Sequence, residues 1–224
     1  MISVPFIVIE GNIGAGKTTL ATMLSKDLNG RLILERFADN PFLPKFYKEP
    51  ERWAFTLELS FLADRYKQLK EELLQPSLFD QYIIADYYFM KSLIFSKQTL
   101  AEDEFNLYKQ LFEIIYYNLP KPNIFVYLHA PIEKIMYQIK LRGRSYEQDI
   151  SKEYLQNIHN NYLEFIDTQK NIPVLIINTE NLDFVNNPSD YKQIKNTIFE
   201  HLNKKGIHKK FFISNKICDS KNDL

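Results

Sequence analysis

Short, almost continuously apolar runs recur along the chain and predict the strands of one sheet. Runs that do not alternate with polar residues are typical of parallel strands covered by helices on both faces. Segments of helical periodicity separate the runs, and this alternation predicts an α/β fold with a parallel sheet wrapped by helices. The five predicted strands are Phe6–Glu10, Leu32–Leu34, Tyr82–Asp86, Ile124–Leu128 and Val174–Asn178.

Helical periodicity fills the segments between the strands. A first helix is predicted over Thr18–Leu28, and Asn29-Gly30 can end it with a left-handed cap. A long helix is predicted over Glu51–Leu74, and it and a later segment carry apolar stripes that we interpret as core or as a dimer seam. The stripe positions are Phe55, Leu59, Leu62, Tyr66, Leu69 and Leu73, then Phe105, Tyr108, Phe112 and Ile115.

One loop contains half of the six glycines in the chain, directly after the first predicted strand. The run GNIGAGKTT fits the phosphate-binding pattern G-x-x-x-x-G-K-[ST], with the strand before and the helix after that this pattern requires. Backbone N–H groups can hold phosphate oxygens, while Lys17 adds a charge for the β- and γ-phosphates and Thr18 a hydroxyl for Mg²⁺. The residues predicted to bind a nucleoside triphosphate are Gly11, Asn12, Ile13, Gly14, Ala15, Gly16, Lys17, Thr18 and Thr19.

The composition restricts the partners that the chain could bind. Its 28 basic and 28 acidic residues balance, so no large electrostatic field is available to hold a polyanion such as nucleic acid. The single cysteine, Cys218, cannot form an internal disulfide, which suits a reducing compartment. We find no signal peptide and no apolar run of membrane-spanning length. We therefore expect a cytoplasmic protein with a small ligand, no nucleic acid and no membrane partner.

The length of 224 residues suits one α/β domain with a full core. Helical periodicity ends near Asn203, so we expect this domain over residues 1–203 and a tail over residues 204–224. Paired lysines in the tail could mark a partner site, but we interpret the tail as a solvated, flexible end.

Two carboxylates are predicted at the carboxyl edge of the sheet, where folds of this class bind their ligands. Glu35 follows the second predicted strand and could take a proton from an attacking hydroxyl. Asp86 ends the third predicted strand and could hold Mg²⁺ together with Thr18. The alternatives are a solvent-facing acid at Glu35 and a helix N-cap at Asp86, and Asp86 is also the rival candidate for the base.

A pair of arginines lies beyond the predicted amphipathic helix Ile132–Ile139. A fourth glycine, Gly143, separates Arg142 from Arg144. Guanidinium groups that close over a transferring phosphoryl group stabilise the charge on its oxygens. In a chain predicted to bind a triphosphate, we interpret the pair as an arginine-rich lid and not as solvated surface.

Together these features resemble the deoxynucleoside kinases of the deoxycytidine/deoxyguanosine kinase type, including bacterial deoxyadenosine and deoxyguanosine kinases. The resemblance extends to about Phe184. It implies a P-loop kinase fold and transfer of the γ-phosphoryl group of ATP, with Mg²⁺, to the 5′-hydroxyl of a deoxynucleoside for nucleotide salvage. It rests on the phosphate loop, Glu35, Asn40-Pro-Phe-Leu, Tyr47-Lys-Glu-Pro-Glu-Arg-Trp53-Ala-Phe-Thr, Arg65, Arg142-Gly-Arg144 with Glu147-Gln148, and Thr179-Glu-Asn-Leu-Asp183-Phe184.

The resemblance also implies roles for individual residues. Glu35 resembles the general base on the 5′-hydroxyl, and Tyr47 and Glu147 resemble the pair that holds the 3′-hydroxyl of the sugar. Asp183 and Phe184 resemble the loop that holds the donor adenine, and the two lid arginines and the loop lysine resemble the catalytic cations. The family is usually dimeric through a helix bundle, which the two striped helices could form, so we expect a homodimer.

The chain departs from the family pattern beside the third strand. The family usually has an arginine directly after the strand-end acid, whereas this chain reads Asp86-Tyr87-Tyr88. Lys91, one turn further on, is the candidate substitute. Ser92 stands where several members have an aspartate that pairs with the base-site arginine.

A second departure affects the choice of base. Glu58 stands where many members have a glutamine, and it is seven residues before Arg65, so both would lie on one flank of the long helix. The two side chains either read the acceptor base or form an ion pair with each other. A carboxylate that accepts and a guanidinium that donates complement guanine, so the sequence favours purines, deoxyguanosine first and deoxyadenosine next.

Other functions remain open at this level. A nucleoside-monophosphate kinase would need a further basic cluster near Tyr47 or Arg65, and we find little. A nucleotide-binding, non-catalytic subunit of a heteromer is kept open by the missing arginine after Asp86. A GTPase switch is disfavoured because no Asn-Lys-x-Asp motif is present.

Overall fold

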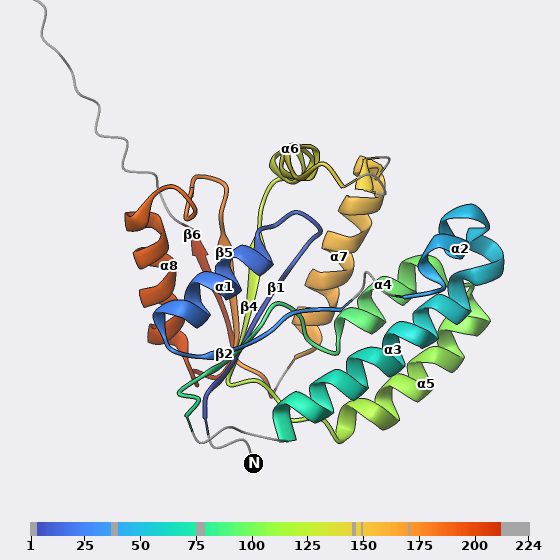
Figure 1. Cartoon of the computed structure of the whole chain (residues 1–224), viewed down its shortest axis with the longest axis horizontal. Coiled ribbons are helices and arrows are strands. Elements are labelled where there is room, and N and C mark those ends of the chain that lie inside the picture. Colours follow the sequence, from blue (N-terminus) through green and yellow to red (C-terminus); the bar gives the residue numbers. More distant parts are fainter. Residues whose placement is uncertain are drawn as a thin grey trace, which may run out of the picture.

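The computed structural model describes residues 4–36, 40–74, 79–144, 147–148, 150–169 and 171–211, and it confirms the predicted α/β architecture. All strand pairs are parallel, in the order β2-β3-β1-β4-β5-β6 (Figure 1). The chain places β2 and β3 on one side of β1 and then β4, β5 and β6 on the other side. The carboxyl end of β1 therefore lies at the crevice where such sheets bind ligands. The strands are β1 (Phe6–Gly11), β2 (Arg31–Ile33), β3 (Ile83–Ala85), β4 (Ile124–His129), β5 (Val174–Asn178) and β6 (Ile207–Phe211).

The prediction of five strands is wrong, because the described residues form six. The sixth strand, β6, pairs in parallel with β5 and lies in the segment that the sequence analysis expected to be without regular structure. It is an edge strand and carries Lys209 and Lys210, so it has none of the apolar continuity that marks the central strands. Residues 212–224 of the predicted tail lie outside the described residues.

Helices connect the strands, and their ends follow local sequence signals. Gly16 precedes α1 with φ 88° and Gly143 follows α6 with φ 70°, and both conformations favour glycine. Asn29, with φ 47°, confirms the predicted left-handed residue after α1. The helices are α1 (Lys17–Asp27), α2 (Leu43–Lys48), α3 (Pro50–Leu74), α4 (Lys91–Thr99), α5 (Glu102–Tyr117), α6 (Ile132–Arg142), α7 (Lys152–Thr168) and α8 (Pro188–His201).

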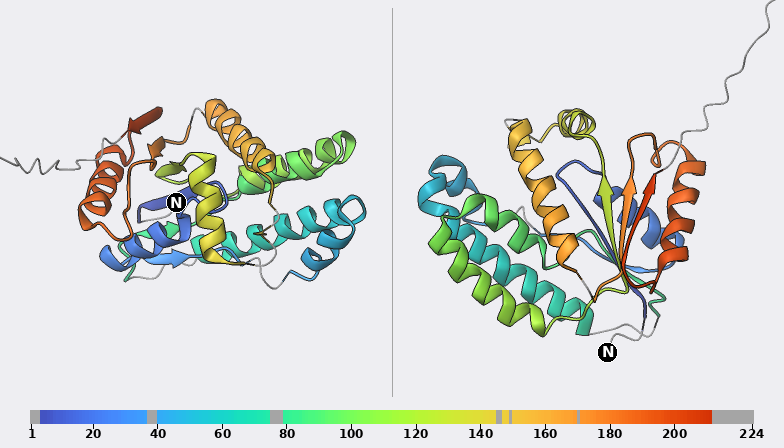
Figure 2. Two further views of the ribbon diagram at one scale, coloured as in Figure 1. Left: turned by 90° about the horizontal axis from the view of Figure 1, so that it is seen from above. Right: turned by 180° about the vertical axis from the view of Figure 1, so that it is seen from behind.

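Each face of the sheet has its own hydrophobic core, because successive side chains of a strand point to opposite faces. Phe6 and Val8 of β1 join the core formed with α3, α4, α5 and α7. Ile7 and Ile9 join the core formed with α1 and α8 on the other face. Figure 2 shows these two sets of helices on either side of the sheet, with α6 above the carboxyl ends of the strands.

Helix α3 buries charged side chains as well as apolar ones, which the sequence analysis did not expect. Leu62 and Leu69 are buried as predicted, but Leu59 is 37% exposed. Glu58 and Arg65, expected on the flank of the apolar stripe, are instead buried. The four buried positions 58, 62, 65 and 69 have helical spacing, so the two charged side chains lie on the same buried face of α3 as the two leucines.

No helix among the described residues has both the length and the apolar composition needed to cross a membrane.

Candidate active site

The phosphate loop depends on glycine at two positions where the chain packs closely. Gly14 and Gly16 have φ of 79° and 88°, in the left-handed region. A Cβ on Gly14 would lie 2.9 Å from Cγ1 of Ile139 on α6, and one on Gly16 would lie 2.9 Å from Cζ of Phe184. The loop is therefore held against the arginine-bearing helix and against the predicted adenine loop at the same time.

Lys17 follows the loop and begins α1. Its Nζ donates to the backbone oxygen of Asn12 at 2.8 Å, and the Asn12 side chain donates to the backbone oxygen of Leu155 on α7 at 2.7 Å. Burial and the nearby ammonium group of Lys91 lower the pKa of Lys17 to about 8. Because phosphate oxygens would favour the charged form, Lys17 is suited to neutralise a bound polyphosphate.

Asp86 forms hydrogen bonds with both the phosphate loop and the segment that follows β2. Its Oδ2 accepts from Oγ1 of Thr18 at 2.6 Å, and its Oδ1 accepts from the backbone N–H of Glu35 at 3.0 Å. The N-cap alternative is wrong, because α4 begins only at Lys91. Hydroxyl and carboxylate oxygens are ligands that suit Mg²⁺, which binds few protein groups and keeps several waters. Thr18 and Asp86 therefore fit the predicted metal role.

Glu35 lies between two cations at the carboxyl edge of the sheet. Its Oε1 accepts from Nε and from a terminal nitrogen of Arg65, at 3.0 and 2.7 Å, and its Oε2 accepts from Nζ of Lys91 at 2.5 Å. Burial opposes ionisation, but the charges of Lys91 and Arg65 outweigh it and lower the pKa of Glu35 to about 2. The solvent-facing alternative is wrong, and the carboxylate is ionised at neutral pH.

Lys91 reaches this carboxylate from α4, one turn beyond the strand-end acid. The residue directly after that acid, Tyr87, is fully buried, and its hydroxyl donates to Oε1 of Gln68 at 2.8 Å. Gln68 in turn donates to the backbone oxygen of Leu34 at 2.9 Å. Tyr87, at the position where the expected arginine is missing, thus supports the segment after β2 that carries Glu35. The second cation at the Glu35 carboxylate is Lys91.

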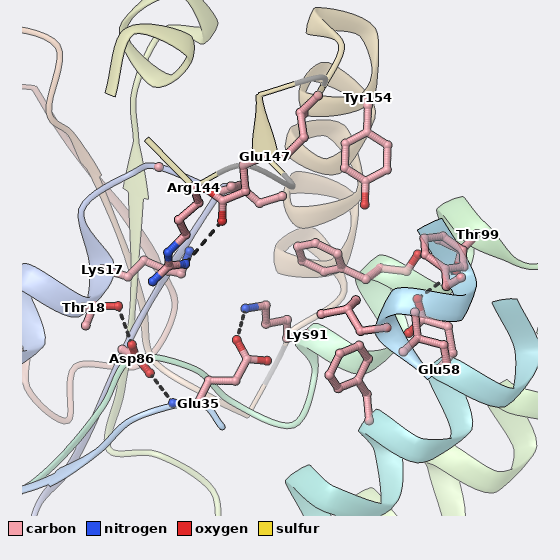
Figure 3. Close-up of a pocket in the computed structure, with 18 of the residues that line it drawn as sticks. Lys17, Thr18, Glu35, Glu58, Asp86, Lys91, Thr99, Arg144, Glu147 and Tyr154 are labelled. Atoms are coloured by element: carbon pink, nitrogen blue, oxygen red, sulfur yellow. Dashed lines mark hydrogen bonds and ion pairs between the residues drawn. The ribbon is translucent and has the colours of Figure 1, made fainter. Parts of the chain in front are cut away.

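A cleft of about 350 Å³ extends from the phosphate loop between the sheet and the helices. Figure 3 shows Lys17 and Thr18 at one end, Glu58 and Thr99 at the other, and Glu35 between them. The volume suits a small, largely enclosed ligand. The sequence-predicted residues that line this cleft are Ile13, Gly14, Lys17, Thr18, Glu35, Tyr47, Glu58, Arg65, Asp86, Arg142, Arg144 and Glu147.

Glu58 and Arg65 do not pair, although both side chains are described and line the same cleft. Arg65 donates to Glu35 and, through its other terminal nitrogen, to Oγ of Ser92 at 2.9 Å. Oγ1 of Thr99 donates to Oε1 of Glu58 at 2.9 Å, and Oε2 of Glu58 has no hydrogen-bond partner among the described residues. The ion-pair alternative for Glu58 and Arg65 is therefore wrong.

The two predicted lid arginines converge on Glu147. Helix α6 continues three residues beyond its predicted end and finishes at Arg142. A terminal nitrogen of Arg142 donates to Oε2 of Glu147, and one of Arg144 donates to Oε1 at 3.3 Å. Both arginines also line a second cleft of about 450 Å³, formed by the phosphate loop and by residues that include Asp183 and Phe184. The arginines thus lie where the two clefts meet.

A sequence model of the family described as deoxynucleoside kinase matches residues 7–203. The chain belongs to the deoxynucleoside kinase family. It is similar to deoxyguanosine kinase of Bacillus subtilis, at 39% identity over 87% of this chain and 96% of the relative. It is also similar to deoxyadenosine kinase of Dictyostelium discoideum, at 39% identity over 77% of this chain and 71% of the relative. The solved structure of deoxyadenosine kinase from M. mycoides with bound dCTP is similar in fold, with a TM-score of 0.74 and 27% identity over 87% of this chain and 99% of that chain.

Membership of the deoxynucleoside kinase family confirms the reaction class that the resemblance implied. The chain is an ATP-dependent phosphotransferase that acts on deoxynucleosides. The family match covers the phosphate loop, both strand-end acids and the arginine pair.

Sequence reasoning missed Glu10, which organises the centre of this deoxynucleoside kinase. The side chain is fully buried, where its Oε1 accepts from the backbone N–H of Tyr88 at 2.9 Å and its Oε2 from the hydroxyl of Tyr162 at 2.7 Å. Burial raises its pKa. Through these hydrogen bonds Glu10 connects β1 to α7 and to the segment that follows Asp86. An acid at the end of an apolar run, directly before a phosphate loop, is the signal that could have identified it.

Sequence reasoning also missed Lys134 on α6. Its Nζ donates to the backbone oxygens of Thr179, Glu180 and Leu182, at 2.5, 3.2 and 2.9 Å. These contacts hold the loop that leads to Phe184 against the helix that ends at Arg142. A lysine on an amphipathic helix gives no sequence signal for such a role.

Proposed function

We propose that this deoxynucleoside kinase prefers purine deoxynucleosides, deoxyguanosine before deoxyadenosine, with ATP as the phosphoryl donor. The observation that carries the preference is Glu58, a carboxyl group at the end of the cleft opposite Lys17. An ionised carboxylate can accept hydrogen bonds from N1–H and N2–H₂ of guanine. The names of the two similar relatives, a deoxyguanosine kinase and a deoxyadenosine kinase, support the purine class.

In the proposed reaction Glu35 is the general base. It accepts the proton of the 5′-hydroxyl as the O5′ atom forms its bond to the γ-phosphorus and the bond to the β-phosphate oxygen breaks. Because phosphoryl transfer has a loose transition state, the hydroxyl proton is lost late, and a strongly basic carboxylate is not required. Arg65 and Lys91 hold both oxygens of Glu35, which supports a role in orienting it.

The other proposed roles depend on which of the two clefts a residue lines. We call the cleft of about 350 Å³ the acceptor cleft and the cleft of about 450 Å³ the donor cleft. Tyr47 and Glu147 line the acceptor cleft and would hold the 3′-hydroxyl of the sugar. Asp183 and Phe184 line the donor cleft and would hold the adenine of ATP. The arginine pair and Lys17, which line both clefts, would stabilise the charge on the transferring group.

Mg²⁺ would bind through Thr18 and Asp86, whose oxygens lie 2.6 Å apart. When bound, the ion would neutralise charge on the donor phosphates. Within the described residues no group of three or more His, Cys, Asp or Glu side chains could hold a metal on its own. A site completed by phosphate oxygens and water agrees with the way Mg²⁺ usually binds in kinases.

A coupled assay of ADP formation tests the proposed preference. We expect the highest kcat/KM for deoxyguanosine, a lower value for deoxyadenosine, and values lower by at least ~10-fold for thymidine and deoxycytidine, the scale of one or two lost hydrogen bonds. Nucleoside monophosphates serve as the control acceptors and should give no turnover. A clear pyrimidine preference would contradict the proposal, and turnover of monophosphates alone would replace it with the monophosphate-kinase alternative.

We also propose that the protein is a homodimer through α3 and α5. These helices run side by side at the margin of the molecule opposite β6 (Figure 1). On α5, Leu107 and Ile114 are two turns apart and 51% and 68% exposed, and Leu59 of α3 is also exposed. Exposed apolar residues on two adjacent helices are suited to a helix-bundle interface with a second copy.

Sedimentation equilibrium checks the assembly. We expect a mass of twice the 26.6 kDa of one chain, and a shift toward the monomer for Ile114→Glu, because a charge would be buried in the interface. Tyr137→Glu on α6 is the matched control, since Tyr137 is exposed on a helix remote from α5. A monomeric wild-type protein would contradict the proposal.

A further inference from the structure

We propose that Glu58 changes the base preference of this kinase by changing its own protonation state, so that the ionised carboxylate selects guanine and the protonated carboxyl group selects adenine. The inference rests on the proposed function, because it requires that the acceptor base lies at the Glu58 end of the cleft. It goes beyond that function by making substrate choice depend on pH.

The geometry of Glu58 is the first support. The residue is 4% exposed, lines the acceptor cleft, and has only one oxygen engaged, through the hydroxyl of Thr99. Its Oε2 is buried without a hydrogen-bond partner among the described residues. A buried polar atom without a partner is costly, so a ligand that supplies the missing donor or acceptor gains affinity. The cleft is the place from which such a ligand would come.

Opposing effects act on the pKa of the Glu58 carboxyl group. Burial raises the pKa of Glu58 to about 7, against the lowering effects of Arg65 and of the Thr99 hydrogen bond. Glu35 opposes ionisation and Lys91 favours it, but those two groups are paired with each other. The Arg65 charge is likewise engaged by Glu35 and does not reach the Glu58 carboxylate as a hydrogen-bond donor.

Neutral groups complete the surroundings of Glu58. From α5, the hydroxyl of Tyr108 donates to the backbone oxygen of Glu58 at 3.3 Å and not to its carboxylate. From α7, Tyr154 lies close enough for its own pKa to be raised by Glu58 and by Tyr47 of α2. Both phenols have pKa values raised by burial, so they stay neutral while Glu58 titrates. A change of pH near neutrality therefore alters the charge of Glu58 without altering these neighbours.

The two protonation states of a carboxyl group recognise different edges of a purine. An ionised carboxylate only accepts, and the Watson–Crick edge of guanine offers N1–H and N2–H₂ as neighbouring donors. A protonated carboxyl group donates from one oxygen and accepts at the other, which matches N1 and N6–H₂ of adenine. The proton comes from solvent, so the ratio of guanine to adenine phosphorylation should increase as the pH is raised.

The test is the ratio of kcat/KM for deoxyguanosine to kcat/KM for deoxyadenosine, measured from pH 5.5 to pH 8.5. If each base uses only one state of Glu58, the ratio changes by up to about tenfold per pH unit, and we expect at least ~10-fold over the whole range. A ratio removes effects of pH on phosphoryl transfer that both substrates share. A ratio that stays constant with pH would overturn the inference.

Glu58→Gln is the deciding variant, because it keeps the shape of the side chain but cannot titrate. Its amide donates and accepts, so we expect a preference shifted toward deoxyadenosine and a ratio that no longer depends on pH. A pH-dependent ratio that persists in this variant would assign the effect to another group and overturn the inference.

A modified substrate provides a test that does not depend on the folding of a variant. 1-Deaza-2′-deoxyadenosine lacks the N1 acceptor, so with the wild-type enzyme it should lose the low-pH gain that deoxyadenosine shows. If it keeps that gain, protonated Glu58 does not donate to N1. Failure of the proposed function is distinguishable, because a pyrimidine deoxynucleoside would then have the highest kcat/KM, whereas failure of this inference leaves the purine preference in place with a constant ratio.

Discussion

Glu35→Gln is expected to lower kcat by at least ~10²-fold, the usual scale for the loss of a general base, while ATP binding stays near normal. The amide keeps the shape of the side chain but cannot accept the proton of the 5′-hydroxyl. Glu35 contributes to the acceptor cleft and does not line the donor cleft, so the ATP dissociation constant should change little. Steady-state turnover, together with calorimetric titration of ATP, separates the two effects.

Asp86→Asn is the comparison that assigns the base. Asp86 accepts hydrogen bonds from Thr18 and from the backbone of Glu35, which fits its proposed role in binding Mg²⁺. Its variant should therefore raise the Mg²⁺ concentration needed for half-maximal activity. Near wild-type turnover in Glu35→Gln, with Asp86→Asn inactive, would exchange the two assignments. Thermal unfolding of both variants should be checked, since Glu35→Gln leaves the Arg65 and Lys91 charges without their common partner.

Arg142→Ala and Arg144→Ala are each expected to lower kcat by about 10²-fold, and to raise the KM for ATP by less. The scale follows from the effect of arginine on phosphoryl-transfer transition states, here shared by two side chains. An interaction that strengthens in the transition state acts on kcat, whereas one that is equal in the ground state acts on KM. Initial rates over a matrix of ATP and deoxynucleoside concentrations give both constants.

Lys140→Ala is the matched control for the arginine variants. Lys140 is exposed, lies on the same last turn of α6, and lines neither cleft. It should leave kcat and KM within about twofold of the wild type, as expected for a surface substitution. If the arginine variants raise KM alone, the two residues bind ground-state phosphates and take no part in the transition state.

The part of the site that lies at the carboxyl edge of the sheet could be predicted from the sequence. Parallel strands bring their carboxyl ends to one edge, so the order of residues along the chain is enough to place Thr18, Glu35 and Asp86 together. The hydrogen bonds that join them are local consequences of that edge. The glycines of the phosphate loop were likewise predictable, because only a few sequences form a tight turn between a strand and a helix.

The remaining contacts depend on how helices pack, which one sequence does not reveal. Periodicity predicts a stripe on α3, but only packing decides that Glu58 and Arg65 face the cleft and Leu59 faces outward. Lys91 and Glu35 are 56 residues apart in the chain, so only the three-dimensional arrangement brings them together. Strand β6 was missed because two of its five residues are lysines, and its order depends on pairing with β5.

If Arg142 and Arg144 act on the transferring phosphoryl group as proposed, their pairing with Glu147 has a consequence for futile hydrolysis of ATP. While Glu147 accepts hydrogen bonds from Arg142 and Arg144, part of the donor capacity of each guanidinium is engaged. A sugar hydroxyl that engages Glu147 would compete for its oxygens and release the arginines toward the donor. Water in an otherwise empty cleft offers no comparable anchored hydroxyl, so both arginines would stay paired with Glu147 until an acceptor binds. The same carboxylate would then both recognise the sugar and protect the donor from wasteful cleavage.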